Sequence, residues 1–312
     1  MTTALLFPGQ GAQVVSMGKD VYDAHESARK IFDIAEDVSG LPLKKLCFEG
    51  PQEDLSRTDM AQPAIFTVSA AMMAVMQDIL GDKMPASDFT AGLSLGEYTA
   101  LYAAGAMDLE TGIKLVTRRG RAMQAAAEAA PSSMICVIGM DEAQATELCE
   151  AASEGETLTP ANFNCPGQIV LSGAIGACQR AGDKAKDFGA SAAKMLDVAG
   201  AFHSRFMASA ADELALALED VTFDTPKVPV LSNVDAKPHT SSDDIKQKLL
   251  AQLVSPVRWQ HCMEYLIAAN VDKFVEIGPG KVLAGLMRRI QRRSDFTSVN
   301  AGSVIDKLAQ DG

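Results

Sequence analysis

The sequence predicts an α/β protein in which helices cover both faces of a parallel sheet and a smaller subdomain is inserted into the chain. Towards both ends, short apolar runs alternate with helical patterns, which is typical of a parallel sheet covered on both faces. Between them, residues 131–199 show the order β-α-β-β-α-β, the split pattern of a ferredoxin-like unit. We therefore expect a large domain from residues 1–130 and 200–312, and a ferredoxin-like subdomain from residues 131–199.

The first part of the large domain is expected to hold two strands and several helices. Residues 3–7 form an apolar run that ends at a Pro-Gly turn, and residues 89–93 form a second short strand. The segment 61–80 is nearly all apolar and is therefore expected to be a deeply buried helix. Further helices are expected at residues 16–38, 94–105 and 108–130.

The inserted subdomain is bounded by recognisable caps and breaks. Asp141 is a good helix N-cap, Gly189 closes a helix, and Pro160 indicates an edge strand or an early strand end. Its strands are expected at residues 132–139, 157–163, 168–173 and 191–198, and its helices at 141–153 and 174–189. After it, we expect helices at 204–219, 242–253, 258–269 and 281–293, and strands at 228–233 and 273–278.

The composition excludes several classes of function. With 28 basic and 40 acidic residues, the net charge of −12 argues against a nucleic-acid surface. The six cysteines show neither CxxC nor metal-finger spacing, so we expect free thiols, a reducing compartment and no metal or prosthetic group. The N-terminus lacks signal-peptide features, and the apolar stretch 61–76 is too short and mixed to span a membrane. We therefore expect a cytoplasmic protein.

The segment Gly92-Leu93-Ser94-Leu95-Gly96 follows a predicted strand and opens a predicted helix. This is the context of a nucleophile elbow, where glycines allow a tight turn and a helix start can hold an oxyanion. A structural alternative stays open, because Ser94 and Glu97 also fit a capping box. A nucleotide site is disfavoured, since Gly9-Gln10-Gly11 lacks the rest of a GxGxxG fingerprint.

A serine nucleophile needs a base, and the chain has four histidines. His25 lies in a charged amphipathic segment, His239 lies in a polar loop that is expected to be solvated, and His261 sits beside Trp259 in a helix. His203 is the best candidate, because a segment of small apolar residues meets a helix start there. With a pKa of ~6.5, His203 would be a workable base at neutral pH. The alternative is that His203 has only a structural role.

Several segments in order resemble the malonyl-CoA:acyl carrier protein transacylase family. The match runs through most of the chain, and so many segments in one order are more specific than any single motif. The matching segments are Phe7-Pro8-Gly9-Gln10-Gly11-Ala12-Gln13, Gly92 to Tyr98, Arg119-Gly120, Asn162-Phe163-Asn164, Pro166-Gly167-Gln168, Ala201-Phe202-His203-Ser204, Asn233-Val234 and Glu276-Ile277-Gly278-Pro279-Gly280. The resemblance implies a hydrolase-like α/β domain with a ferredoxin-like insert.

The resemblance also implies roles for individual residues. Ser94 would carry the malonyl ester, and His203 would accept its proton. Backbone N–H groups of Gln10 and Leu95 would hold the oxyanion, and Arg119 would pair with the malonyl carboxylate. No bound cofactor is implied; the substrates would be malonyl-CoA and the pantetheine-bearing acyl carrier protein, a transient partner.

Further family positions surround this set. Gln252 matches the residue whose main-chain carbonyl orients the histidine, and Phe202, Asn162 and Asn233 would shape the pocket. In related domains the order Ala-Phe-His goes with malonyl rather than branched substrates. One departure is Leu93, because the family usually has a histidine directly before the nucleophile. That histidine is not the family's base, so the predicted pair of Ser94 and His203 is kept.

The arginines of the chain have two expected roles. A guanidinium matches a carboxylate in a fork, so Arg118-Arg119 is a sensible anchor; the alternative is two solvated helix positions. A second, basic cluster suits an acidic carrier protein, because arginines four residues apart would lie on one face of a helix. A solvated helix end that favours cations explains the cluster equally well. This cluster comprises Lys281, Arg288, Arg289, Arg292 and Arg293.

Two rival functions stay open from the residues alone. In an α/β serine hydrolase the catalytic residues follow the order Ser, acid, His, and the histidine lies late in the chain. Here about a hundred residues follow His203, which argues against this class. A non-catalytic subunit that binds acyl carrier protein would use Ser94 only as a helix cap. Free malonate would favour the hydrolase, and carrier binding without a covalent malonyl adduct would favour the subunit.

Overall fold

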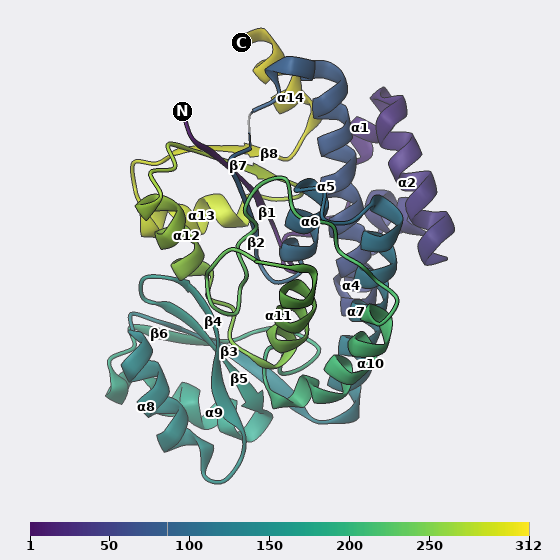
Figure 1. The fold of residues 1–312 in the computed structure, drawn as a ribbon. Helices are drawn as coiled ribbons and strands as arrows, with labels where there is room; N and C mark the ends of the chain where they lie inside the picture. The colour runs from purple at the N-terminus through teal and green to yellow at the C-terminus, as the bar shows by residue number, and fades with distance from the viewer. Residues whose placement is uncertain (86, 312) are drawn as a thin grey trace.

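The computed structural model describes residues 1–85 and 87–311, and it builds them around two sheets (Figure 1). The larger unit contains a parallel sheet of strand order β2-β1-β7-β8. These strands are β1 (Thr3–Phe7), β2 (Phe89–Gly92), β7 (Lys273–Ile277) and β8 (Asp295–Val299). All five residues of β1 are buried, as expected for a central strand of a sheet covered on both faces. The predicted α/β class is confirmed.

Helices from both ends of the sequence cover this sheet. The first group comprises α1 (Lys19–Ala24), α2 (Glu26–Ser39), α3 (Leu43–Glu49), α4 (Gln52–Ser56), α5 (Thr58–Leu80), α6 (Gly96–Ala103) and α7 (Leu109–Ala129), with a 3-10 turn at Gly81–Lys83. The second comprises α10 (Ala208–Leu218), α11 (Ser242–Val254), α12 (Trp259–Ala268), α13 (Val282–Ile290) and α14 (Gly302–Asp311), with a 3-10 turn at Arg205–Met207.

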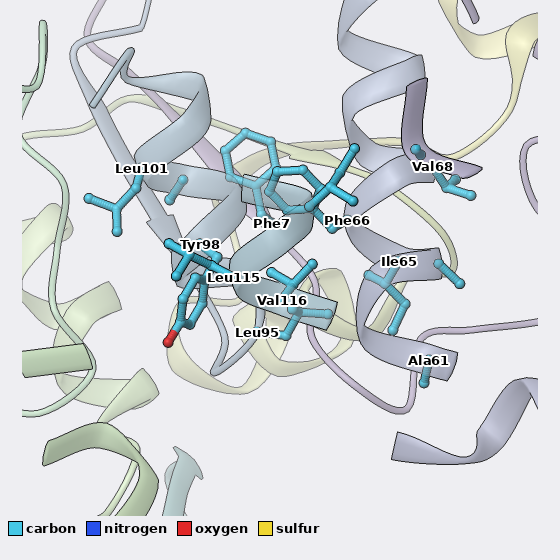
Figure 2. Packing of buried hydrophobic residues seen from close by; sticks show 14 of the residues in the cluster. Phe7, Ala61, Ile65, Phe66, Val68, Leu95, Tyr98, Leu101, Leu115 and Val116 are labelled. Carbon is cyan, nitrogen blue, oxygen red and sulfur yellow. The ribbon is translucent and has the colours of Figure 1, made fainter. Parts of the chain in front are cut away.

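Helix α5 is the central helix of the large unit. Figure 2 shows its residues Ile65 and Phe66 packed beside Phe7 of β1 and Val116 of α7. The expectation that this stretch is too short and mixed to cross a membrane is wrong, because Thr58–Lys83 is long and apolar enough; however, 67% of its most apolar window is buried inside the protein. That burial is what a core helix of a globular protein shows, as the sequence predicted for this segment.

The second unit is an antiparallel sheet of order β4-β5-β3-β6 with helices on one face. Its elements are β3 (Ser132–Ile138), α8 (Glu142–Ser153), β4 (Leu158–Cys165), β5 (Gln168–Ala174), α9 (Ile175–Lys184), a 3-10 turn (Ala185–Phe188) and β6 (Ala192–Met195). This is the predicted βαββαβ order, and β4 is an edge strand as Pro160 indicated. The residue boundaries of the two domains stay a prediction.

Some predicted elements differ from the structure. Residues 16–38 are not one helix, because His25 is extended between α1 and α2, and the turn packs Tyr22 edge-on against Phe32 with ring centroids 5.6 Å apart. Among the described residues, the segment 228–233 forms no ladder; isolated bridges join Val230 to Thr90 of β2 and Leu231 to Pro238. Strand β8 and the helices α3, α4 and α14 were not predicted.

Candidate active site

Ser94 lies at a sharp corner between β2 and α6. Its backbone has a φ of 51°, in the left-handed region that a non-glycine residue adopts only under local constraint. Gly92 and Gly96 make the corner possible, since a Cβ at Gly92 would overlap the backbone of Gly96, and one at Gly96 would overlap the carbonyl of Phe7. Helix α6 has no side-chain cap, so the capping-box alternative for Ser94 is wrong.

The hydroxyl of Ser94 faces His203 instead. Ser94 Oγ lies 2.9 Å from His203 Nε2, and His203 Nδ1 lies 2.7 Å from the main-chain oxygen of Gln252. A carbonyl oxygen only accepts, so Nδ1 carries the proton and Nε2 is free to accept one from the serine. The structure therefore brings together the three positions that the sequence named for proton transfer.

His203 is 5% exposed and lies in the segment that leads from the antiparallel sheet back into the large unit. Burial, with a smaller contribution from the positive charge of Arg119, lowers the pKa of His203 to about 4. The expectation of an ordinary pKa near 6.5 is therefore wrong. The imidazole is neutral at neutral pH, which is the form that can take a proton.

Arg119 reaches the same point from α7. It is only 1% exposed, and its Nη2 donates to Ser94 Oγ at 3.0 Å and to Gln252 Oε1 at 2.8 Å, while Nη1 donates to Gln62 Oε1 at 2.6 Å. Its guanidinium lies over the ring of Tyr98, 5.3 Å from the centroid. The solvated alternative is wrong for Arg119 and describes only its exposed neighbour Arg118.

A cavity of about 750 Å³ opens in front of Ser94. Gln10 and Leu95 line it, and within residues 1–85 and 87–311 neither backbone N–H donates a hydrogen bond. Phe202 and Asn162, the predicted pocket residues, also line it, as does Leu93. Free N–H groups beside a nucleophile suit an oxyanion.

Asn233 lies behind the corner and outside the cavity lining. Its Oδ1 accepts from the backbone N–H of Ser94 at 2.6 Å, and its Nδ2 donates to the carbonyl of Gly92 at 2.8 Å. Asn233 thus fixes the backbone on which the serine is mounted. It shapes the site without facing the cavity.

Comparisons with known proteins show the family to which the chain belongs. A family model described as "Acyl transferase domain" matches residues 4–308. The malonyl CoA-acyl carrier protein transacylase of Bacillus subtilis (strain 168) is 42% identical over 308 residues, which cover 98% of this chain and 96% of the relative. The chain belongs to the malonyl CoA-acyl carrier protein transacylase family. As a family member, it shares a fold with solved transacylases along nearly its whole length.

Two solved structures show this likeness. The malonyl CoA-acyl carrier protein transacylase of Coxiella burnetii superposes with a TM-score of 0.95 at 36% identity, covering 99% of this chain and 97% of that one. A malonyl-transacylase in complex with its type II PKS acyl-carrier protein superposes with a TM-score of 0.93 at 37% identity, with both chains covered fully, at 100%. The predicted hydrolase-like core with a ferredoxin-like insert is therefore confirmed as the transacylase fold.

Sequence reasoning missed three buried residues of this transacylase site. Gln62 contacts Arg119, Glu97 contacts Gln252 at 2.7 Å, and His239 Nε2 lies 2.9 Å from Glu97 Oε1. The prediction that His239 is solvated is wrong, because its side chain is fully buried. A signal was available for Gln62, since it lies in the nearly all-apolar segment 61–80, and buried polar residues need a partner.

The predicted basic cluster lies at the edge of the transacylase cavity. Its residues Lys281, Arg288, Arg289, Arg292 and Arg293 are all exposed, and Val282 and Leu286 of the same helix α13 line the cavity. The predicted helix-face spacing is wrong, because α13 ends at Ile290 and Gln291 is extended towards β8. Arg292 and Arg293 therefore follow the helix. Among residues 1–85 and 87–311, no cluster of His, Cys, Asp and Glu is arranged to hold a metal ion.

Proposed function

We propose that this chain transfers a malonyl group from malonyl-CoA to the pantetheine thiol of acyl carrier protein through a malonyl ester on Ser94. The observation that carries the proposal is the meeting of His203 and Arg119 at the hydroxyl of Ser94. Ser94 Oγ lies 2.9 Å from the neutral base His203 and 3.0 Å from the guanidinium of Arg119. A nucleophile, a base and a carboxylate anchor suit an acyl group that ends in a carboxylate.

The first half-reaction forms the ester. Ser94 Oγ attacks the thioester carbon as His203 Nε2 takes its proton, and the N–H groups of Gln10 and Leu95 hold the oxyanion. The C–S bond then breaks, and His203 returns the proton to the departing CoA thiolate. The carbonyl of Gln252 steadies the transient imidazolium through Nδ1–H.

Arg119 selects the acyl group. The malonyl carboxylate would be costly to bury without a cationic partner, and the buried guanidinium offers a planar fork. Its Nε is buried and has no hydrogen-bond partner within the described residues, so one donor of the guanidinium is unused. Phe202 limits the room beside the reacting carbonyl and supports malonyl over branched substrates.

The second half-reaction repeats these steps with the carrier. The pantetheine thiol gives its proton to His203 and attacks the ester carbon, and Ser94 leaves with the returned proton. The solved complex of a related malonyl-transacylase with its acyl-carrier protein supports such a partner. The exposed arginines around α13 suit an acidic carrier.

The cycle uses only side chains and backbone groups. Six free cysteines support a reducing, cytoplasmic location.

Intact-protein mass after incubation with malonyl-CoA tests the proposal. The expected result is the added mass of one malonyl group, absent in Ser94→Ala and strongly reduced in Arg119→Ala, with Arg118→Ala as the exposed control. Holo-acyl carrier protein should then discharge the adduct to malonyl-carrier. Free malonate in place of malonyl-carrier would identify a hydrolase. No adduct at all would identify a non-catalytic carrier-binding protein.

A further inference from the structure

Glu97 is a fully buried carboxylate that takes no part in the steps above. It lies on α6, one turn after Ser94, and its exposed fraction is 0%. Its Oε2 accepts from the backbone N–H of Asn233 at 2.9 Å and from Gln252 Nε2 at 2.7 Å, and His239 Nε2 lies 2.9 Å from its Oε1. Such a group is costly to bury, so its three contacts call for an explanation.

The partners of Glu97 are the residues that hold the reacting groups. Gln252 accepts from Arg119 through Oε1 at 2.8 Å, donates to the carbonyl of Ser94 at 3.1 Å, and accepts from His203 through its main-chain oxygen at 2.7 Å. Asn233 accepts from the Ser94 backbone. A single hydrogen-bonded residue, Gln252 or Asn233, therefore connects the Glu97 carboxylate to the nucleophile, the base and the anchor.

The carboxamide of Gln252 separates Glu97 from Arg119. Its N–H faces the carboxylate and its oxygen faces the guanidinium, so the amide dipole is aligned with both charges. Burial lowers the pKa of Arg119, and Tyr98 and Glu97 oppose that lowering. A carboxylate in direct contact would occupy the guanidinium fork that a substrate carboxylate needs. A counter-charge held behind an amide stabilises the positive charge of Arg119 without itself contacting the guanidinium.

We propose that Glu97 is a positioning residue for malonyl selection: through Gln252 it orients Arg119 and supplies its counter-charge, and His239 fixes Glu97 from the other side. This inference rests on the function proposed above. It predicts that loss of the Glu97 charge lowers the preference for malonyl-CoA over an uncharged acyl-CoA, because the anchor is disturbed more than the nucleophile.

The test compares Glu97→Gln with a matched buried glutamate. Glu276 is also 0% exposed, but it accepts from the start of α13 and from Ser298 of β8, and it has no hydrogen bond to Ser94, His203, Arg119 or Gln252. Acylation rates of Ser94 by malonyl-CoA and by acetyl-CoA are measured for wild type, Glu97→Gln and Glu276→Gln. We expect the malonyl-to-acetyl ratio to fall about ten-fold or more in Glu97→Gln, as for the loss of a charged hydrogen bond, and to stay at the wild-type value in Glu276→Gln.

An Arg119→Ala background shows whether the effect passes through the anchor. There, adding Glu97→Gln should change the ratio by less than about two-fold, since coupled positions are not additive. Equal losses with both substrates, or a full ten-fold effect without Arg119, would overturn the inference. If Glu97→Gln does not fold, Glu97→Asp, which keeps the charge but draws the carboxylate back from Gln252, tests the positioning role, and its malonyl-to-acetyl ratio should fall in the same direction. A wild type that forms no malonyl adduct would instead overturn the proposed function.

Discussion

Three side chains from distant parts of the sequence meet at one hydroxyl, and each is held by contacts of its own. Ser94 is fixed by the backbone corner and Asn233, His203 by the carbonyl of Gln252, and Arg119 by the amide oxygens of Gln62 and Gln252. The site is therefore organised before substrate arrives. Preorganised donors are what make such a site effective in a buried cavity.

The depressed pKa of His203 predicts how acylation depends on pH. The pKa is about 4 in the folded protein against an ordinary value of 6.5, so the imidazole stays neutral from neutral pH down to mildly acidic pH. We expect the rate of Ser94 acylation to be flat between about pH 6 and 8 and to fall only as pH approaches 4. Quenched-reaction mass measurements at each pH report this rate, and a rise of the rate centred near pH 6.5 would contradict it.

The same shift predicts the stability of the fold. Between pH 6.5 and about 4 the unfolded chain binds a proton at His203 that the folded chain excludes, so the free energy of unfolding decreases as pH falls through this window. Denaturation midpoints of wild type and His203→Gln at pH 7 and pH 5 provide the control. The wild type should lose more stability than the variant.

At the site, the residues predicted from sequence were those in short motifs. The roles that were missed depend on contacts between residues far apart in the sequence. Ser94, His203, Arg119 and Gln252 stand in recognisable segments, and the structure brings them together. Glu97 fitted a local capping box, but its carboxylate contacts residues more than a hundred positions away. Only the fold determines which buried polar groups pair.

Helices and strands with a strong apolar pattern were predicted correctly. Those that depend on pairing with a distant strand were not. Helix α5 and strand β1 have apolar patterns that tertiary contacts only reinforce. Strand β8 reads DFTSV, with exposed and half-buried positions, and becomes a strand because the edge of β7 pairs with it. Residues 228–233 resemble a strand, yet they meet β2 at one bridge, since pairing depends on the partner.

The corner between β2 and α6 allows a prediction about glycine. In Gly96→Ala the new methyl group would meet the carbonyl of Phe7 and, near by, that of Pro8, both backbone atoms that cannot swing away. We expect a loss of about 3 kcal/mol in the free energy of unfolding, as for overpacking in a rigid core. Chemical denaturation measures the loss.

A glycine in open space gives the control for this substitution. Gly285 lies in α13 with nothing within 4 Å of an added Cβ, so Gly285→Ala should gain about 0.5–1 kcal/mol from helix propensity. Equal effects at the two glycines would show that the corner tolerates a side chain. In that case the tight approach of α6 to β1 would not be what sets the position of Ser94.

In the whole molecule, the two units enclose the cavity between them. The large unit supplies Ser94 and Arg119, and the antiparallel sheet supplies Asn162 and Val170 to the lining. The two are joined by backbone hydrogen bonds, from Val257 N–H to the carbonyl of Ala161 at 2.8 Å and from Phe163 N–H to the carbonyl of Val257 at 2.9 Å. Both units therefore contribute residues to the wall of the cavity.

The charge distribution of the whole molecule predicts how the carrier binds. The chain carries a net charge of −12, which repels an acidic carrier at long range, so the exposed arginines around α13 at the cavity edge should guide its approach. We expect the double substitution of Arg288→Glu and Arg292→Glu to raise the KM for acyl carrier protein about ten-fold, a change of about 1.4 kcal/mol. Acylation of Ser94 by malonyl-CoA should be unchanged.

A charge reversal elsewhere separates a local effect from net charge. Lys30 is exposed on α2, which Figure 1 shows on the opposite side of the molecule from α13, so Lys30→Glu, compared with the single reversal Arg288→Glu, should leave the carrier KM near the wild-type value. The difference between the two variants should shrink as ionic strength rises, because salt screens charges on the scale of about 10 Å at 0.1 M. An unchanged KM in the double variant would assign carrier binding to another face of the protein.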